Sequence, residues 1–302
     1  MSTRFGVAGN SDTFTNTVSK SSLDAPAWLA EIGLDHYEYQ CGRGVRVKEE
    51  TARLLGEKAR QSGITLSIHA PYFISLSNPD PEALGKNIGY VTASCQAAKW
   101  MGAERIVVHS GALMKRTRRE AMEIAKTSLK AILNACDEQG YGDLVLCPET
   151  MGKINQLGDL DEVLELCALD ERLLPCVDFG HLYARTLGEL NGAAACKMML
   201  DKMADALGEE RASRFHSHFS KIEFTLKGGE ARHLCFSDRG WGPEFAPLAE
   251  EIARRDWSPI IVCESAGTQS EDALTMKQIY RSIRKGSNYE PSEQNKGTAA
   301  QI

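Results

Sequence analysis

The stretch Leu174-Pro-Cys-Val-Asp-Phe-Gly-His181 decides how the rest of the chain is interpreted. It contains a short apolar run typical of a buried strand, then an acidic residue and, three positions later, a histidine. Five other segments end in the same way, with a β-rich apolar run followed by a histidine or a glutamate. A single Asp-x-x-His sequence is common, but six strand ends that all carry metal-ligand side chains indicate a shared site.

Eight strand-like runs alternate with segments of helical periodicity along the chain. The predicted strands cover residues 4–8, 34–39, 64–68, 105–108, 144–149, 173–177, 215–218 and 259–263. The predicted helices cover residues 24–32, 47–62, 81–102, 115–139, 159–169, 189–207, 244–255 and 271–284. This alternation predicts an α/β fold, a (β/α)₈ TIM barrel that forms a single domain over residues 1–285. Residues 286–302 have no periodicity and are predicted to form a disordered tail.

Composition and charge limit the class of protein. The 302 residues are 42% hydrophobic and 25% charged, which is enough for a large core. The formal net charge of −6 argues against binding of nucleic acid through bulk positive charge, but not through a local basic rim or bound cations. The nine cysteines include no Cys-x-x-Cys pair, so we expect buried reduced thiols. Without a signal peptide or an apolar run of membrane-spanning length, we expect a cytoplasmic monomer that contacts no membrane.

Polar side chains gather at the predicted strand ends, where barrels of this class place their active sites. All the histidines except His36 fall at or just after such an end. A single histidine there is more often hydrogen-bonded than functional. Several imidazoles in one pocket repel each other when protonated, however, and a metal ion gives a reason to gather them. The candidate ligands are His69, His109, Glu149, Asp178, His181, His218, His233 and Glu264, with His216 on the same face as His218.

The number of candidate ligands indicates more than one ion. Imidazole suits Zn²⁺ and also Mn²⁺ and iron, whereas a carboxylate can bridge two ions. One tetrahedral ion uses four ligands, so we expect two or three clustered ions, most simply Zn²⁺. Clustered divalent ions activate water and stabilise the oxygens of a phosphoryl displacement, which indicates phosphoester hydrolysis. The alternative is a sugar isomerase or epimerase on the same barrel with one or two divalent ions. A non-catalytic binding protein is a third interpretation, disfavoured by the nearly complete ligand set.

Short motifs over residues 69–264, nearly the whole barrel, resemble the endonuclease IV family of apurinic/apyrimidinic endonucleases, within the xylose-isomerase-like barrels. The motifs are Ile68-His-Ala-Pro-Tyr-Phe-Ile-Ser-Leu76, Val107-Val-His-Ser-Gly111, Pro148-Glu-Thr-Met-Gly-Lys153 with Gln156-Leu-Gly158, Val177-Asp-Phe-Gly-His181, His218-Phe-Ser220, Arg232-His233 and Cys263-Glu264. Each motif alone is unspecific, but their order is specific.

The resemblance implies a trinuclear zinc site that cuts the backbone of damaged double-stranded DNA 5′ to an abasic site, as in base excision repair. By position, His69 and His109 hold one ion and Glu149 bridges two. Five further residues would complete the other ligand shells: Asp178, His181, His218, His233 and Glu264. Glu149 and Glu264 are the catalytic candidates, because either can orient the attacking water.

The resemblance also implies residues that contact DNA. Tyr72 and Phe73 stand where family members insert side chains at the lesion, although packing under the loop is an equal alternative. Arg43 and Arg46 on the loop after the second strand are candidate phosphate contacts, although exposed arginines are more often simply solvated. The basic run 115–119 is the best candidate for a DNA-facing surface, with a solvated helix start as the alternative.

Two features depart from the family pattern or leave it open. The family has Asp-x-His on the loop after the seventh strand, whereas this chain has Ala231-Arg-His233. Glu230, one residue earlier, can reach the same place only through its longer side chain; otherwise one ion is held weakly or lost. His216 and His218 both fit the seventh strand, and the spacing to His233 favours His218.

Overall fold

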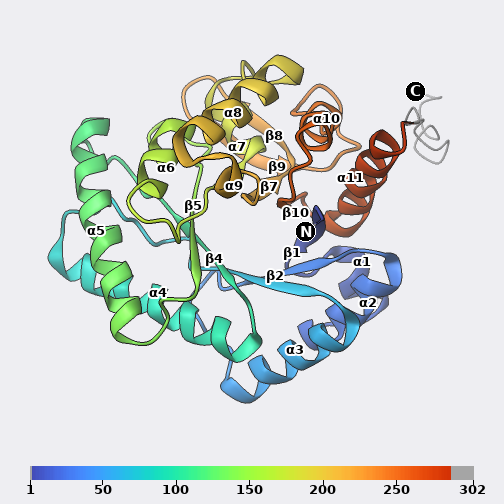
Figure 1. The fold of residues 1–302 in the computed structure, drawn as a ribbon, viewed down its shortest axis with the longest axis horizontal. Helices are drawn as coiled ribbons and strands as arrows, with labels where there is room; N and C mark the ends of the chain where they lie inside the picture. The colour runs from blue at the N-terminus through green and yellow to red at the C-terminus, as the bar shows by residue number, and fades with distance from the viewer. Residues whose placement is uncertain (1, 287–302) are drawn as a thin grey trace.

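Eight parallel strands close a barrel in the computed structural model, which describes residues 2–286 (Figure 1). Their order around the barrel is β1-β10-β7-β6-β5-β4-β3-β2. The strands are β1 (Arg4–Ala8), β2 (His36–Gln40), β3 (Thr65–His69), β4 (Arg105–His109), β5 (Val145–Glu149), β6 (Cys176–Asp178), β7 (His216–Phe219) and β10 (Ile260–Cys263). The predicted (β/α)₈ barrel is therefore confirmed, with β6 shorter than the predicted strand. The predicted tail beyond Gly286 lies outside the described residues.

Eight helices occupy the predicted positions around the barrel: α2 (Ala25–Ile32), α3 (Glu49–Ser62), α4 (Pro81–Met101), α5 (Arg118–Glu138), α6 (Leu160–Cys167), α8 (Gly192–Leu207), α10 (Ala246–Arg255) and α11 (Gln269–Arg284). The predicted start of α5 at residue 115 is wrong. Met114 and Lys115 have φ of 50° and 65°, which a right-handed helix does not allow. Thr117 and Glu120 form a capping box, so the helix begins at Arg118.

Three short α-helices are absent from the sequence-based prediction: α1 (Asp12–Thr17), α7 (Phe179–Arg185) and α9 (Glu209–Ala212). Each has fewer than eight residues, too few to give a clear helical period. In α7 the Asp178 side chain accepts a hydrogen bond from the backbone N–H of His181 at 2.7 Å, as an N-cap does. A Cβ at Gly180 would lie 2.6 Å from the carbonyl oxygen of Ser220, so glycine allows α7 to pack against the end of β7.

The segment after β7, predicted as a long loop, is a β-hairpin. Strand β8 (Lys221–Thr225) pairs antiparallel with β9 (Gly229–Leu234). The alternation of β8, Lys-Ile-Glu-Phe-Thr, was a signal for a strand, but its partner β9, Gly-Glu-Ala-Arg-His-Leu, has no such alternation, so the hairpin was missed. The hairpin rises from the barrel and carries Glu230 and His233 on its second strand.

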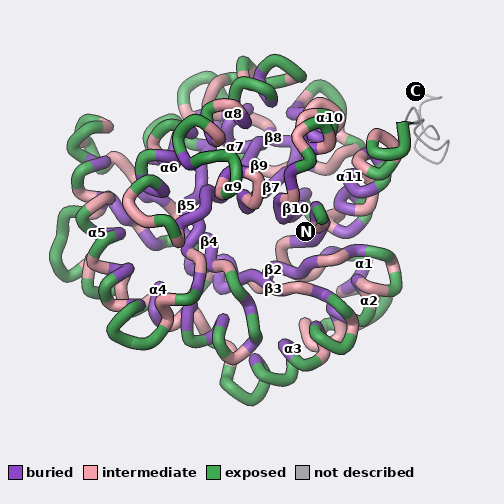
Figure 2. The backbone as a smooth tube through the Cα atoms, viewed as in Figure 1, coloured by how far each residue is buried: buried purple, intermediate pink, exposed green. Residues whose placement is uncertain are grey.

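The buried residues lie on the strands and on the inner faces of the helices, as Figure 2 shows. They form two separate hydrophobic clusters. The larger cluster packs the helices on the outside of the barrel. A separate small cluster contains Val107, Cys147, Leu174 and Cys176. Three of these residues lie two positions before a predicted ligand, so they face the barrel interior below the site. The nine cysteines are unpaired, and eight of them are buried, as predicted.

Other interior positions are polar, although barrels usually fill their interior with branched apolar side chains. His36, Glu38, Ser67 and His216 are each 0% exposed. Within residues 2–286, no helix has the length and apolar character needed to cross a membrane.

Candidate metal centre

A cavity of about 300 Å³ opens at the C-terminal ends of the barrel strands. Seven of the predicted site residues line it, from loops and strands that are distant in sequence. They are His69, Tyr72, His109, Glu149, His181, His233 and Glu264. Asp178 and His218 are fully buried and contact residues of this lining. The structure therefore brings all eight predicted ligands together at one end of the barrel.

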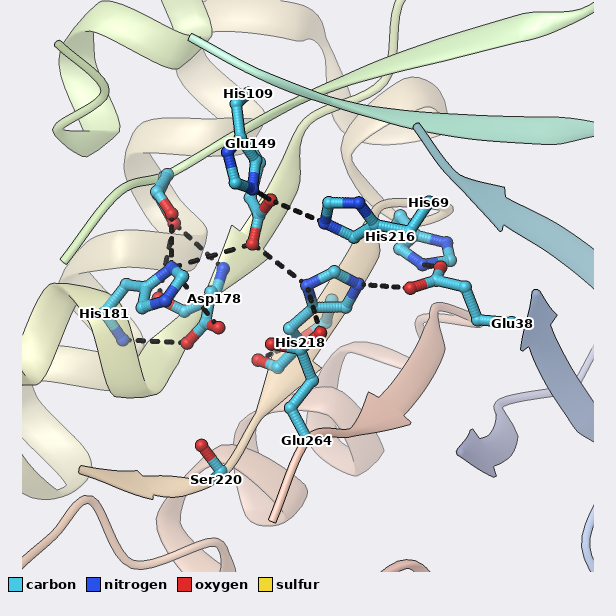
Figure 3. A network of polar contacts seen from close by, with 12 residues as sticks. Glu38, His69, His109, Glu149, Asp178, His181, His216, His218, Ser220 and Glu264 are labelled. Atoms are coloured by element: carbon cyan, nitrogen blue, oxygen red, sulfur yellow. Dashed lines mark hydrogen bonds and ion pairs between the residues drawn. The ribbon is translucent and has the colours of Figure 1, made fainter. Parts of the chain in front are cut away.

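Glu149, the last residue of β5, lies at the centre of this group (Figure 3). Its Oε2 is 3.3 Å from Nε2 of His69 and 3.2 Å from Nε2 of His109. Its Oε1 is 3.0 Å from Nδ1 of His218 and 3.6 Å from Nδ1 of His181. The two carboxylate oxygens thus face different histidines, as the oxygens of a carboxylate that bridges two ions must.

Most of the histidines have one ring nitrogen fixed by a partner outside the cavity. Nδ1 of three of them donates to a backbone carbonyl: His69 to Ala70 at 2.7 Å, His109 to Tyr72 at 2.8 Å and His181 to Thr150 at 2.8 Å. Nδ1 of His233 lies 2.8 Å from Oγ of Ser220. A carbonyl can only accept, so Nε2 of the first three histidines keeps its lone pair when the ring is neutral. This arrangement is typical of metal-ligating histidines.

The ligand atoms form three groups whose members lie within 4.8 Å of one another and that contain only predicted ligands and Glu230. They are His69, Glu149 and His218; Glu149, Asp178, His218 and Glu264; and His181, Glu230 and His233. Oδ2 of Asp178 is buried and has no hydrogen-bond partner among the described residues. This oxygen lies 3.4 Å from Nδ1 of His181, which donates to the carbonyl of Thr150 instead, so a cation would give the buried carboxylate the partner that it lacks. The donor set of imidazoles and carboxylates fits Zn²⁺, Mn²⁺ or iron.

A β-bulge explains how Glu230 reaches the third group. Glu223 pairs with Arg232 while Phe224 pairs with Glu230, so Ala231 has no partner on β8. One extra residue shifts the alternation of side chains, and it places Glu230 and His233 on the same face of β9 although they are three positions apart. Oε2 of Glu230 lies 3.6 Å from Nε2 of His181. The carboxylate expected at position 231 is thus supplied from position 230.

The two histidines of β7 have different surroundings. Nδ1 of His218 faces Glu149 and, at 3.5 Å, Oε1 of Glu264, whereas Nε2 of His216 contacts Glu38 at 2.9 Å. The geometry therefore favours His218 as the ligand from β7. Glu38 is a polar residue of the site that the sequence-based prediction missed. The signal was present, because Glu38 alternates with His36 and Gln40 on the interior face of β2.

Electrostatic coupling is strong throughout the group. Burial opposes ionisation of Glu149, but His218, His109 and His69 hold its pKa well below the ordinary value. Burial also opposes protonation of His69, yet Glu149 raises the pKa of that imidazole to about 9. Burial likewise disfavours His181 protonation, and Asp178, Glu230 and Glu149 raise its pKa to about 9. Any cation that binds must therefore displace protons from these histidines.

The predicted DNA-contacting residues lie near the cavity with different exposures. Tyr72 is 57% exposed and lines the cavity, while Phe73 is 43% exposed and packs edge-on against Tyr90 with ring centroids 4.9 Å apart. Arg43 and Arg46 are both exposed on the loop after β2.

The basic run at the start of α5 is not uniformly available to DNA. Arg118 forms a 2.5 Å ion pair with Glu162, and its guanidinium also donates to the carbonyl of Gln156. It therefore fixes the loop between β5 and α6. Lys153 of that loop also lines the cavity, and the sequence-based prediction gave it no role.

Residues 26–285 match the family described as the xylose isomerase-like TIM barrel. The chain belongs to this family. It is 31% identical over 249 residues to the uncharacterized protein MJ0133 of Methanocaldococcus jannaschii, with 82% of this chain and 88% of the relative covered. It is 27% identical to a probable endonuclease 4 of Mycoplasma pneumoniae, with 54% of this chain and 56% of that relative covered. A probable endonuclease 4 of Acholeplasma laidlawii is also 27% identical, with 64% and 65% covered.

Solved structures with this fold include proteins with different names. A D-tagatose 3-epimerase-like protein superposes with a TM-score of 0.68 at 18% identity, covering 94% of this chain and 98% of the other. Endonuclease IV from Thermus thermophilus gives a TM-score of 0.63 at 21% identity, covering 94% and 100%. At these identities the likeness establishes the fold alone.

Proposed function

We propose that this xylose isomerase-like barrel is a metal-dependent phosphodiesterase that resembles endonuclease IV and cuts double-stranded DNA 5′ to abasic sites. The observation that supports this most strongly is the third ligand group of His181, Glu230 and His233. An isomerase or epimerase that uses one or two ions has no need of a third group, nor of the imidazoles of His69 and His109 beside Glu149. Three groups around one cavity fit a di- or trinuclear centre, for which Zn²⁺ is our proposal.

The residues around the cavity have separable roles in this proposal. When bound, the ions supply Lewis-acid stabilisation of the phosphate oxygens and lower the pKa of the attacking water. Glu264 lies at the cavity with a side chain that is 16% exposed, so it is placed to orient that water and accept its proton. Glu149 is held by several histidines and fixes the geometry of the ligand groups. Lys153 provides a positive charge at the same cavity for the scissile phosphate.

The cavity rim is suited to a DNA backbone more than to a free sugar. Tyr72 presents an exposed ring beside the cavity, and an aromatic side chain can stack in the gap that an abasic site leaves in a duplex. Arg43 and Arg46 are exposed on the neighbouring loop and can contact flanking phosphates. The substrate we propose is therefore damaged double-stranded DNA.

The test is cleavage of a labelled duplex that carries one tetrahydrofuran abasic analogue. We expect a single nick 5′ to the analogue, which a chelator abolishes and added Zn²⁺ restores. Glu264→Gln should slow the nick by about 10²–10⁴-fold if the carboxylate moves the proton of water. Glu165→Gln, at an exposed position of α6, is the matched control and should cut normally. Absence of a chelator-sensitive nick would refute the proposal.

One observation favours a sugar isomerase or epimerase as a second candidate. Glu149, Asp178, His218 and Glu264 form a single four-ligand group, which is sufficient for one catalytic ion. Elemental analysis of the purified protein separates the two candidates. About one ion per chain favours the isomerase, whereas two or three ions favour the phosphodiesterase.

A further inference from the structure

We propose that Glu38, buried inside the barrel, is a positioning residue that holds His218 in the orientation and tautomer needed to bind an ion through Nδ1. The inference rests on the proposed metal centre and adds a residue outside its ligand groups. Glu38 lies on β2 and His218 on β7, which are separated by β1 and β10 in the barrel. The two side chains therefore meet across the interior, where both are 0% exposed.

The contact geometry is that of a carboxylate held by several donors (Figure 3). Oε1 of Glu38 lies 2.9 Å from Nε2 of His218, and Oε2 lies 2.9 Å from Nε2 of His216. Oγ of Ser67 donates to the same Oε2 at 2.7 Å. The three residues Glu38, His216 and His218 are each 0% exposed. Because burial of a carboxylate is costly unless it is paired, this arrangement requires Glu38 to keep its donors.

The donor directions determine the tautomer of His218. An ionised carboxylate has no hydrogen to donate, so both Nε2 atoms that face Glu38 carry a proton. His218 then has Nδ1 left for the other side, where Oε1 of Glu149 lies at 3.0 Å. The same Nδ1 lies 3.5 Å from Oε1 of Glu264, so it is the atom of His218 that faces these two candidate ligands. Rotation of the ring by half a turn would break the Glu38 contact and place Nε2 at the cavity.

His218 differs in this respect from the other four candidate histidines. His69, His109 and His181 donate to neutral backbone carbonyls, and His233 contacts the hydroxyl of Ser220. A carboxylate partner makes an imidazole a stronger electron donor to a cation than a carbonyl does. Loss of the Glu38 charge should therefore weaken ion binding at the groups that share His218.

A hydrogen-bonded chain supports Glu38 from the opposite end of the barrel. Ser67 gives its only hydrogen to Glu38, so it accepts from Nε2 of His36 at 2.8 Å. Nδ1 of His36 lies 2.8 Å from Oγ1 of Thr65. His216 and Ser67 contact Oε2 of Glu38, while Oε1 accepts from His218 and, at 3.2 Å, from the side-chain amide of Gln40. The polar side chains of the barrel interior thus hold Glu38 in place, and Glu38 in turn contacts His218.

The same residues suggest a competing assignment. Cys176, His216 and His218 also lie close enough together to hold an ion. In that case His218 would bind an inner ion together with Cys176 and His216, and Glu38 would not set its orientation for the cavity. Glu38 already has four donors, from Gln40, Ser67, His216 and His218, so its oxygens do not require a cation. A thiolate ligand gives a charge-transfer band with Co²⁺, which makes the two assignments distinguishable by spectroscopy.

The experiment is a Co²⁺ titration of the metal-free full-length protein without DNA, with affinities measured by chelator competition. Glu38→Gln keeps the shape of the side chain and removes its charge. We expect about a 10–100-fold loss of affinity for at least one ion, together with altered visible Co²⁺ bands. Glu38→Asp keeps the charge and should restore part of the affinity. Glu251→Gln, the same substitution at a half-buried, paired acid of α10 that does not line the cavity, should retain the parental affinity.

The outcomes separate this inference from the proposed function. Parental affinity and bands in Glu38→Gln would overturn the role of Glu38 while leaving the metal centre intact. A thiolate band that disappears in Cys176→Ser would also overturn it, in favour of an inner ion. Failure of the parental protein to bind Co²⁺ would refute the metal centre itself, and with it this inference. If circular dichroism shows that Glu38→Gln does not fold, the Co²⁺ affinities of Glu38→Asp and His216→Gln are measured instead. Parental affinities in both variants would overturn the inference.

Discussion

Oε2 of Glu230 lies 3.6 Å from Nε2 of His181, although the residue at the position where the family motif has its acid is Ala231. The bulge at Ala231 shifts the side-chain alternation of β9 by one residue, so the carboxylate and His233 share a face. The substitution of the acid and the bulge therefore compensate each other. Without the bulge, Glu230 would point to the opposite face of β9, and His181 and His233 would have no carboxylate beside them.

Replacement of Glu230 should remove one ion from the protein. Glu230→Ala leaves two imidazoles, too few to hold a cation against the competing protons. We expect elemental analysis to give about one ion fewer per chain than in the parental protein. Glu223→Ala, on the same hairpin but paired with Arg232, is the control and should keep the parental count. An unchanged count in Glu230→Ala would show that Glu230 binds no ion.

Tyr72 and Phe73 should contribute unequally to binding of a lesion. Tyr72 lines the cavity with an exposed ring, whereas Phe73 packs on Tyr90. Tyr72→Ala is expected to cost about 1–3 kcal/mol of binding free energy, the range for loss of a stacked aromatic. Phe73→Ala should cost less. Fluorescence anisotropy with chelator present measures binding without cleavage. Equal losses on abasic and unmodified duplexes would exclude a specific role of Tyr72 at the lesion.

The parts of the fold that the sequence predicts are those with a strong local period. The eight barrel strands and their helices follow from apolar periodicity, and the candidate ligands are found because polar residues sit where those strands end. The short helix α7 has no such period, and its start depends on the capping of His181 N–H by Asp178. The sequence therefore locates the site but not the local turn that orients His181.

The parts that the sequence does not predict depend on contacts between distant elements. Glu38 meets His218 only after the barrel closes, across 180 positions of the chain. Arg118 resembles a surface charge until Glu162, 44 positions away, is placed beside it. The bulge at Ala231 is set by the pairing of β8 with β9. Such tertiary arrangements leave no pattern in a single sequence.

The ion pair between Arg118 and Glu162 should make stability depend on pH. Burial opposes ionisation of Glu162, but hydrogen bonds from Arg118 and from two backbone N–H groups hold its pKa below the ordinary 4.5. A carboxyl group with a lowered folded-state pKa stabilises the protein above its ordinary pKa, and this contribution is lost as the pH falls through the folded-state value. Glu162→Gln should lower the free energy of unfolding by about 1–3 kcal/mol at pH 7.

Because glutamine does not titrate, the difference between Glu162→Gln and the parental protein should shrink as the pH falls below 4.5. Urea unfolding at a series of pH values measures it. Glu165→Gln lies on the same helix at an exposed position, so it should change the free energy of unfolding by less than about 0.5 kcal/mol at any pH. A difference that stays constant with pH would mean that Glu162 acts by packing and not by charge.

Binding of DNA by a chain with a formal net charge of −6 must rely on local positive charge. Arg43 and Arg46 are exposed on the loop after β2, and Gly42 of that loop lines the cavity together with Tyr72. Each arginine that neutralises one phosphate releases condensed counterions, which contributes about 0.9 to the slope of log affinity against log salt. The double substitution Arg43→Ala/Arg46→Ala should therefore lower that slope by about 1.8 if both contact phosphates. Arg53→Ala, an exposed arginine paired with Glu49 on α3, should leave the slope unchanged. An unchanged slope in the double variant would place the DNA on another part of the rim.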